Sequence, residues 1–470
     1  MTTLLIRPTP IDSESATGYL LRLAEANGYT SLLDLDLLVS KEPKLEEVAG
    51  IGTMLATKRL SKLRGAVTRF RNLKMTDPGG LDQQYWNGRR PRYCPACLAA
   101  NSYWRALWDI TLVTACPIHC VELCDSCSKC DHPLSWKRAR LAACDCGAYL
   151  GDRSVVPAQP ECVAVSRYIS SLLETTPRGG IPAIQEPLDR LRLADLLAVC
   201  IFLGGYAQND VRKPTKIADL HDVSIATSFA RAAGDALEAW PSGYRTLLRH
   251  LVSKDGGQAS SNRLAEWFGY FYTALYKRFG DRQFDFLRDE FESYIRDEWS
   301  GQLAERNRRF SKSTRIEHKW ISLTIAGKTL GVKRSVVCSF IERGMLCGQL
   351  HTTATGRTSG TVRRDTLEAL RAEKTHWLTL TEAREVLNLS RKGAYALLRS
   401  GKLHPVSGPT IDGRSIWRFS ASEVIELASQ EWTDPESSIK PHTGGPAHAS
   451  AKGGRTRQLR RRQIVREVVA

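Results

Sequence analysis

Cysteine and histidine residues are concentrated in one short segment, where nine of the 13 cysteines lie between Cys94 and Cys146. Two pairs of close-spaced donors are separated by 18 residues, and two further pairs by 13 residues. Two thiolates on a tight turn can bind one metal ion while a loop returns a second pair to complete a tetrahedron. The spacing therefore predicts two zinc sites. The predicted ligands are Cys94, Cys97, Cys116 and His119 in the first site and Cys127, Cys130, Cys144 and Cys146 in the second.

Four protein ligands leave no position open for water at either ion, so both sites are expected to be structural, with metal binding contributing directly to folding. A disulfide framework is the alternative, but it belongs to small secreted domains, and the opening residues lack the order of a secretion signal. Cys120 and Cys124 remain as weaker competitors for ligand positions. The four cysteines outside the segment are predicted to be small buried hydrophobes, namely Cys162, Cys200, Cys338 and Cys347.

The charge of the chain is unevenly placed. The 470 residues are 42% hydrophobic, which excludes a wholly disordered chain and suggests about three domains. Residues 1–300 hold 37 basic and 35 acidic side chains, whereas residues 301–470 hold 30 and 15. Such an imbalance attracts polyanions, so the last third is expected to bind nucleic acid, with a solubilising surface as the alternative.

No stretch of the sequence predicts a membrane span. The longest uncharged apolar run, residues 196–207, is too short to cross a bilayer and is expected to form a core helix. We therefore expect a cytoplasmic protein that associates with the nucleoid when bound to DNA.

An internal repeat occupies the basic third, because residues 320–346 align without gaps on residues 377–403. Each copy predicts a helix opened by a threonine cap (Thr324, Thr381), a three-residue turn and a second helix, which is helix-turn-helix spacing. In the second copy, turn residues predict a hairpin that returns near Trp417, and a capping box from Ser420 to Glu423 predicts a last helix to about Ser429. Each copy therefore resembles the winged helix-turn-helix of excisionase and MerR-type proteins.

The start of each second helix places cations and small hydroxyls where a recognition helix meets base edges and phosphates. Wing arginines are expected to hold the DNA backbone or the minor groove. Solvated arginines on two protein-docking modules are the alternative. The predicted DNA contacts are Lys333, Arg334 and Ser335 with wing residues Arg357, Arg363 and Arg364 in the first copy, and Ser390, Arg391 and Lys392 with Arg414 and Arg418 in the second.

Several runs around these motifs form a recognisable pattern. They are Arg92-Tyr-Cys-Pro-Ala-Cys-Leu98, Tyr103-Trp-Arg105, Leu112-Val-Thr-Ala-Cys-Pro-Ile-His119 and Cys144-Asp-Cys-Gly147, preceded by an opening segment from Glu14 to Tyr29 that ends in Asn-Gly-Tyr. Together they resemble the TniQ/TnsD family of transposition proteins, closely over residues 5–150 and loosely over residues 151–300. The motif Cys127-x-x-Cys130 belongs to the same pattern, but the chain shows Cys127-Ser-Lys-Cys130 followed by Asp131 where the family usually shows Cys-Pro-x-Cys-Gly.

The resemblance implies a target-selection adaptor that marks an insertion site on double-stranded DNA and catalyses nothing itself. It would recruit the transposon's AAA+ ATPase, of the TnsC/TniB type, and hence the transposase. Two alternatives stay open: a transcriptional regulator whose zinc region serves homodimerisation, and an adaptor that docks on an RNA-guided complex. The second repeat and the basic C-terminal third favour direct reading of DNA.

The sequence thus predicts a mainly α, multidomain protein that is not an enzyme. The run Ala326-Gly-Lys-Thr329 imitates a phosphate-binding loop, but Ser322 stands where its first glycine belongs. Six aromatic residues between Trp267 and Tyr276 are expected to pack in a core rather than form a partner surface. The predicted segments are an N-terminal helical segment (1–90), two zinc-finger knuckles (91–152), a helical domain (153–312), two winged helix-turn-helix repeats (313–374 and 375–432) and a flexible basic tail (433–470).

Overall fold

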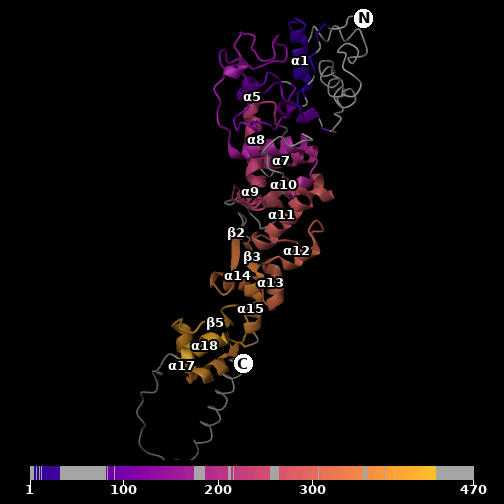
Figure 1. The fold of residues 1–470 in the computed structure, drawn as a ribbon. Helices are drawn as coiled ribbons and strands as arrows, with labels where there is room; N and C mark the ends of the chain where they lie inside the picture. The colour runs from indigo at the N-terminus through magenta and orange to yellow at the C-terminus, as the bar shows by residue number, and fades with distance from the viewer. Residues whose placement is uncertain are drawn as a thin grey trace, which may run out of the picture. The chain divides into compact units, whose positions relative to one another are not determined.

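The computed structural model describes residues 5–31, 81–173, 186–254 and 264–429, apart from positions 7, 10, 12, 82, 89, 210–212, 215, 217, 305, 353–355, 357 and 375. The chain divides into two compact units, one of Met1–Gly256 with Trp267–Phe291 and one of Gly257–Glu266 with Glu292–Ala470. Helices predominate in the described ranges, and the strands there form two small three-stranded sheets, which confirms the mainly α, multidomain prediction (Figure 1). Arg357 and the predicted basic tail lie outside the described residues.

The first unit opens with α1 (Ala16–Ala26), the helix expected from the opening segment. Ser15 caps it: the Ser15 hydroxyl accepts a hydrogen bond from the backbone N–H of Gly18 and donates one of 2.6 Å to the Asp109 carboxylate. The helix ends at Asn27, and Gly28 has φ +77°, a conformation that favours glycine. The cap therefore fixes α1 to the segment that carries the metal-ligand motifs.

Around the cysteines the chain forms only short elements: η2 (Gln83–Tyr85), α5 (Pro95–Ala100), η3 (Ala106–Asp109) and η4 (Leu150–Asp152). Their core is aromatic. Trp104 is fully buried, with ring centroids of Trp108 and Trp136 at 5.5 and 5.2 Å. The Arg138 guanidinium lies 4.7 Å from the Trp104 ring and donates hydrogen bonds to three backbone carbonyls nearby. A buried cation thus packs within this aromatic core and donates its hydrogen bonds to backbone carbonyls.

The helical part comprises α6 (Pro160–Leu173), η5 (Leu188–Arg190), α7 (Leu193–Gln208), α8 (Val223–Glu238), α9 (Ser242–Lys254), α10 (Leu264–Arg278), η6 (Arg282–Phe284) and α11 (Asp285–Asp297). Helix α7 is the predicted core helix, and it packs against α6 and α8. A Cβ at Gly204 would come within 2.7 Å of the Phe229 carbonyl oxygen, so glycine permits the close approach of α7 to α8. None of the described helices is both long and apolar enough to cross a membrane.

The aromatic run of α10 is mainly a core element, as predicted. Phe268 and Phe271 are fully buried and Tyr272 is buried, whereas Tyr270 is 46% exposed. The Phe271 ring stacks on Phe202 of α7 with centroids 4.9 Å apart. Aromatic packing therefore joins α10 to α7.

The second unit contains two similarly folded repeats. Helix α12 (Lys312–Glu317) precedes the first repeat, which comprises β1 (Trp320–Ser322), α13 (Leu323–Leu330), α14 (Arg334–Glu342), β2 (Gly348–Thr352), β3 (Thr358–Arg363) and α15 (Arg364–Lys374). The second comprises β4 (Leu378–Thr379), α16 (Leu380–Leu387), α17 (Arg391–Arg399), β5 (Pro405–Ser407), β6 (Arg418–Phe419) and α18 (Ala421–Ser429). The sheet orders β1-β3-β2 and β4-β6-β5 are equivalent and antiparallel. The repeat seen in the sequence is therefore a structural repeat.

The threonine caps predicted for the first helix of each repeat are wrong by two residues. The caps are Ser322 and Thr379, whose hydroxyls accept from the backbone N–H groups three residues on. Thr379 also shares a capping box with Glu382. Because β1 and β4 end at these two residues, the chain passes directly from strand to helix, and Thr324 and Thr381 lie inside the first turn.

The turns within the repeats are as predicted. Gly331 and Asn388 end the first helices in the left-handed conformation, with φ of 62° and 54°. The Gly-Lys-Thr sequence lies within α13, as expected for a helical segment without a phosphate-binding loop. Helix α18 has the predicted end, but its capping box is wrong: the Ser420 hydroxyl donates to Glu373, and the Glu423 carboxylate accepts from His404.

Candidate metal centres and nucleic-acid interface

The first predicted ligand set meets at one point. Cys94 caps α5, Pro95 begins the helix, and Cys97 lies one turn later, so the tight turn presents both thiols on one side. Donor atoms of Cys94, Cys97, Cys116 and His119 all lie within 4.8 Å of one another. The Sγ atoms of Cys97 and Cys116 are 3.6 Å apart, close to the roughly 3.8 Å that two thiolates on a tetrahedral zinc ion require. This group could hold one metal ion.

Hydrogen bonds within this group favour the thiolate form of Cys116. Hydrogen bonds from the thiols of Cys94 and Cys97 lower the pKa of Cys116 well below its usual value, and the backbone N–H of His119 contributes at 3.5 Å. The thiolate is the metal-binding form of cysteine. The group therefore stabilises a ligand charge that a bound cation would neutralise.

The second predicted set is also assembled, nearer the surface. Cys127 lies 3.7 Å from Cys146, and Cys130 lies 3.7 Å from Cys144, each measured between Sγ atoms. Burial opposes ionisation of Cys127, but the backbone N–H groups of Cys130 and Lys129 outweigh it and lower the Cys127 pKa to about 7. The donor set fits a second ion with four sulfur ligands.

Asp131, where the chain departs from the family pattern, has φ +54°. This is the left-handed conformation that glycine adopts without strain, which explains why a turn of this shape accepts glycine. Aspartate tolerates it better than most residues. The second turn therefore keeps its geometry despite the departure.

Replacing Asp131 by glycine is expected to stabilise the second group by about 0.5–1 kcal/mol, because glycine carries no penalty at this φ. The midpoint of thermal unfolding, followed by circular dichroism on the metal-loaded protein, should rise. Asp131→Ala is the matched control and should lower it. A lower midpoint for the glycine variant would contradict the assignment of strain to this turn.

The remaining cysteines lie outside both groups. Cys120 is exposed and accepts a hydrogen bond from Arg167 at 3.4 Å, and Cys124 is half-buried. Both groups have four ligands without these two residues. Cys162 and Cys200 are buried as predicted, whereas Cys338 is only partly buried. Cys347 is exposed, so its prediction as a buried hydrophobe is wrong; it follows Leu346, whose side chain occupies the core position instead.

A buried arginine that the sequence did not single out joins the first metal group to the helical part. The Arg92 guanidinium donates hydrogen bonds of 2.7 and 3.2 Å to the carbonyls of Thr111 and Val113, and of 2.7 and 3.1 Å to those of Leu220 and His221. Burial lowers the Arg92 pKa to about 10, so the side chain stays charged at neutral pH. In the sequence, the feature that could have drawn attention to Arg92 was its position just before the first ligand pair.

In the second unit, the residues predicted to read base edges lie at the start of the second helix of each repeat. Lys333 caps α14, Arg334 begins it, and Ser335 follows. Ser390 caps α17 with a hydrogen bond from Gly393, and Arg391 and Lys392 follow as exposed side chains. The cationic helix starts predicted for two recognition helices are therefore present in both repeats.

Several predicted DNA-contacting arginines contact protein in this structure. Arg334 donates to the Thr358 carbonyl, and Arg363 pairs with Asp365. Arg418 donates to the Trp377 carbonyl at 3.3 Å, and Arg364 is half-buried at the start of α15. Arg414, on the wing of the second repeat, donates to the Gly331 carbonyl of the first repeat at 2.7 Å. The exposed cations nearest the predicted readout position are Lys333, Arg391 and Lys392.

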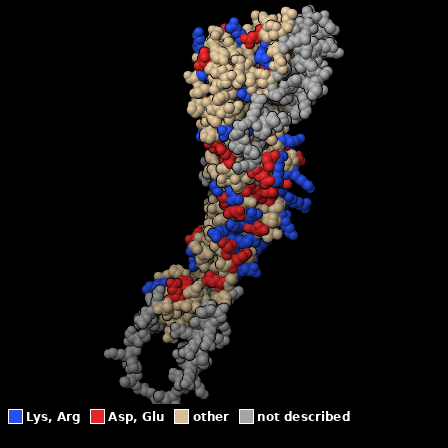
Figure 2. Space-filling model, in the orientation of Figure 1, with Lys and Arg blue, Asp and Glu red and all other residues tan. Residues whose placement is uncertain are grey.

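Sequence reasoning assigned no role to a basic segment that precedes the first repeat. Five exposed cations lie within and beside α12, and Figure 2 shows Lys and Arg side chains gathered there. They are Arg306, Arg308, Arg309, Lys312 and Lys319. In the sequence, the feature that could have identified this segment was its local run of basic residues. The charge count over residues 301–470 did not separate these residues from those of the repeats.

Two family models match the chain. A TniQ model matches residues 5–123, a range that includes α1 and the whole first cysteine-histidine group. A helix-turn-helix domain model matches residues 377–431, which is the second repeat. No curated protein matches the chain. The first repeat lies outside both matches and is identified by its alignment and shared topology with the second.

Proposed function

Since the chain is a TniQ family protein with a C-terminal helix-turn-helix domain, we propose that it selects target DNA for a transposon and recruits the transposon's AAA+ ATPase, and through it the transposase. The two domains make it a DNA-binding, transposition-associated protein. The target selection and the recruitment are the proposed steps.

The observation that carries direct DNA selection is the pair of cationic helix starts in the second unit. The N-terminal end of a helix has unpaired N–H groups and a positive dipole, which favour phosphate oxygens. Arg391 and Lys392 add full charges at that end of α17, and Lys333 and Arg334 do so at α14. Helices of this type enter the major groove and read base edges with their first residues.

The first unit supports the adaptor half of the proposal. Its two four-ligand groups would leave a bound ion no open position, so zinc there would supply folding energy and no activated water. Within the described ranges, these are the two clusters of His, Cys, Asp and Glu able to hold a metal. We therefore propose that the protein is not an enzyme and that ATP hydrolysis and strand transfer belong to its partners.

The proposal is tested by purifying the full chain and selecting duplexes from a pool with a randomised central region. Enrichment of one sequence motif supports direct selection of DNA. Pull-down of the AAA+ ATPase encoded in the same element, with and without the selected duplex, then tests recruitment. A protein that binds the motif but never retains the ATPase fits a transcriptional regulator, and one that enriches no motif fits docking on a guided complex.

Arg391→Ala is expected to weaken binding to the selected duplex by roughly 1–3 kcal/mol, because a base-reading arginine loses its hydrogen bonds to the preferred sequence. Fluorescence polarisation on the selected and a scrambled duplex measures both affinities. The control is Arg399→Ala, an exposed cation at the other end of α17, which should change them little. Equal loss on both duplexes would assign Arg391 to phosphate and contradict base reading.

A further inference from the structure

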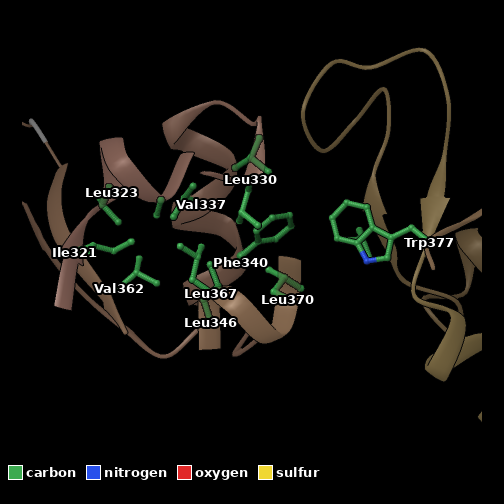
Figure 3. Packing of buried hydrophobic residues seen from close by; sticks show 13 residues of the cluster. Ile321, Leu323, Leu330, Val337, Phe340, Leu346, Val362, Leu367, Leu370 and Trp377 are labelled. Carbon is green, nitrogen blue, oxygen red and sulfur yellow. The ribbon is translucent and has the colours of Figure 1, made fainter. Parts of the chain in front are cut away.

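The two repeats are packed against each other, and this bears on how they meet DNA. Trp377 and Val406 belong by sequence to the second repeat, yet both are buried in the hydrophobic cluster of the first. Figure 3 shows Trp377 on the side of this cluster where Phe340 and Leu370 lie. The Trp377 ring lies 6.3 Å from that of Phe340 at 74°, an edge-on contact. Burying a tryptophan and a valine in a neighbouring core holds the two repeats at one distance and angle.

Polar contacts join the repeats at two further places. Arg343, after α14, donates a 3.0 Å hydrogen bond to the Pro405 carbonyl on β5. Arg414, on the wing of the second repeat, donates to the Gly331 carbonyl in the turn of the first. The wing tip of one repeat therefore lies against the helix-turn-helix turn of the other.

A cleft of about 600 Å³ lies between this wing tip and turn. Its lining includes four cationic side chains, Lys328, Lys333, Arg334 and Arg414, and one carboxylate, Asp412. Asp412 is turned inward: its side chain is 4% exposed and accepts hydrogen bonds from the Ser407 hydroxyl and the Gly408 and Arg414 backbone N–H groups. The carboxylate thus shapes the wing and lies 3.7 Å from the Arg414 guanidinium, and the other charged side chains of the lining are all cations.

We propose that the two repeats read DNA as one rigid body and that this cleft, between the helix-turn-helix turn of the first repeat and the wing tip of the second, holds the sugar-phosphate backbone. The inference rests on the proposed direct reading of DNA. Two readers on a flexible tether accept half-sites at many separations, whereas two readers fixed in register accept one. The cleft has three cations from the first repeat and one from the second, an arrangement that suits a polyanion passing from one repeat to the other.

The spacing of the selected site tests the rigid body. The full chain should enrich a two-part motif with a single separation, and inserting about five base pairs, half a helical turn, should place the halves on opposite faces and lower affinity at least tenfold. Half-sites that tolerate every insertion would overturn this inference and leave direct reading intact. Failure to enrich any motif would overturn both.

The cleft is tested separately with Lys328→Ala and Arg414→Ala on the intact selected duplex. Each variant should weaken binding several-fold and reduce the slope of log affinity against log salt by about one, as loss of a phosphate contact does. Arg371→Ala, an exposed cation of α15 outside the cleft, is the matched control. Cleft variants that bind like the control, with unchanged salt slopes, would overturn the assignment.

Discussion

Cys97→Ser is expected to yield a protein that retains one metal ion instead of two and in which residues 91–126, the part that precedes the second ligand set, no longer fold. Serine is a poor zinc ligand, and the segment has few regular elements to hold it without the ion. Structural zinc supplies roughly 10–16 kcal/mol in zinc-finger peptides, so losing one ion exceeds the stability of a typical domain. Metal analysis of the purified chain gives the ion count and its identity, and limited proteolysis should show new cleavage in this segment.

Cys120→Ser is the control for that experiment, because Cys120 lies in the same segment but outside both four-ligand groups. It should keep both ions and resist proteolysis like the unaltered chain. Two ions in the Cys97 variant, or an unaltered chain that contains no metal, would contradict the assignment of structural zinc.

Arg92→Ala should lower the free energy of unfolding of the first unit by about 3–5 kcal/mol. The change removes a buried cation and leaves four backbone carbonyls without its hydrogen bonds, two beside the metal-ligand segment and two before α8. Urea unfolding followed by tryptophan fluorescence is a suitable measurement, since Trp104 and Trp108 are buried in the same core.

Arg90→Ala provides the matched comparison two residues away. Arg90 pairs with Asp222 at 2.7 Å, but the two side chains are 42% and 32% exposed, so the pair is screened by water and its loss should cost at most about 1 kcal/mol. Equal destabilisation by both variants would mean that charge near this junction matters more than the four buried hydrogen bonds of Arg92.

The metal groups and the repeat were predictable because both depend on spacing. Donors with one or two residues between them on a turn must lie close together, so the two groups of four donors could be predicted before any fold was known. The caps at Ser322 and Thr379 were missed because a serine or threonine stands at both candidate positions, two residues apart, and the end of the preceding strand decides between them.

The roles of Arg92 and Arg414 could not be predicted for a different reason. From sequence alone, an arginine is predicted to be a solvated or DNA-binding cation, since arginine residues are seldom buried. Both donate to carbonyls far along the chain, on Leu220 and Gly331 respectively. Such partners are determined only once packing between segments is known.

Trp377 also bears on the order in which the chain matures during synthesis. The first repeat leaves the ribosome before Trp377 and Val406, the two residues that complete its cluster. Until Val406 on β5 has been translated, the cluster that contains Phe340 and Leu370 is incomplete. We therefore expect the first repeat to gain its full stability only once the second repeat has been synthesised.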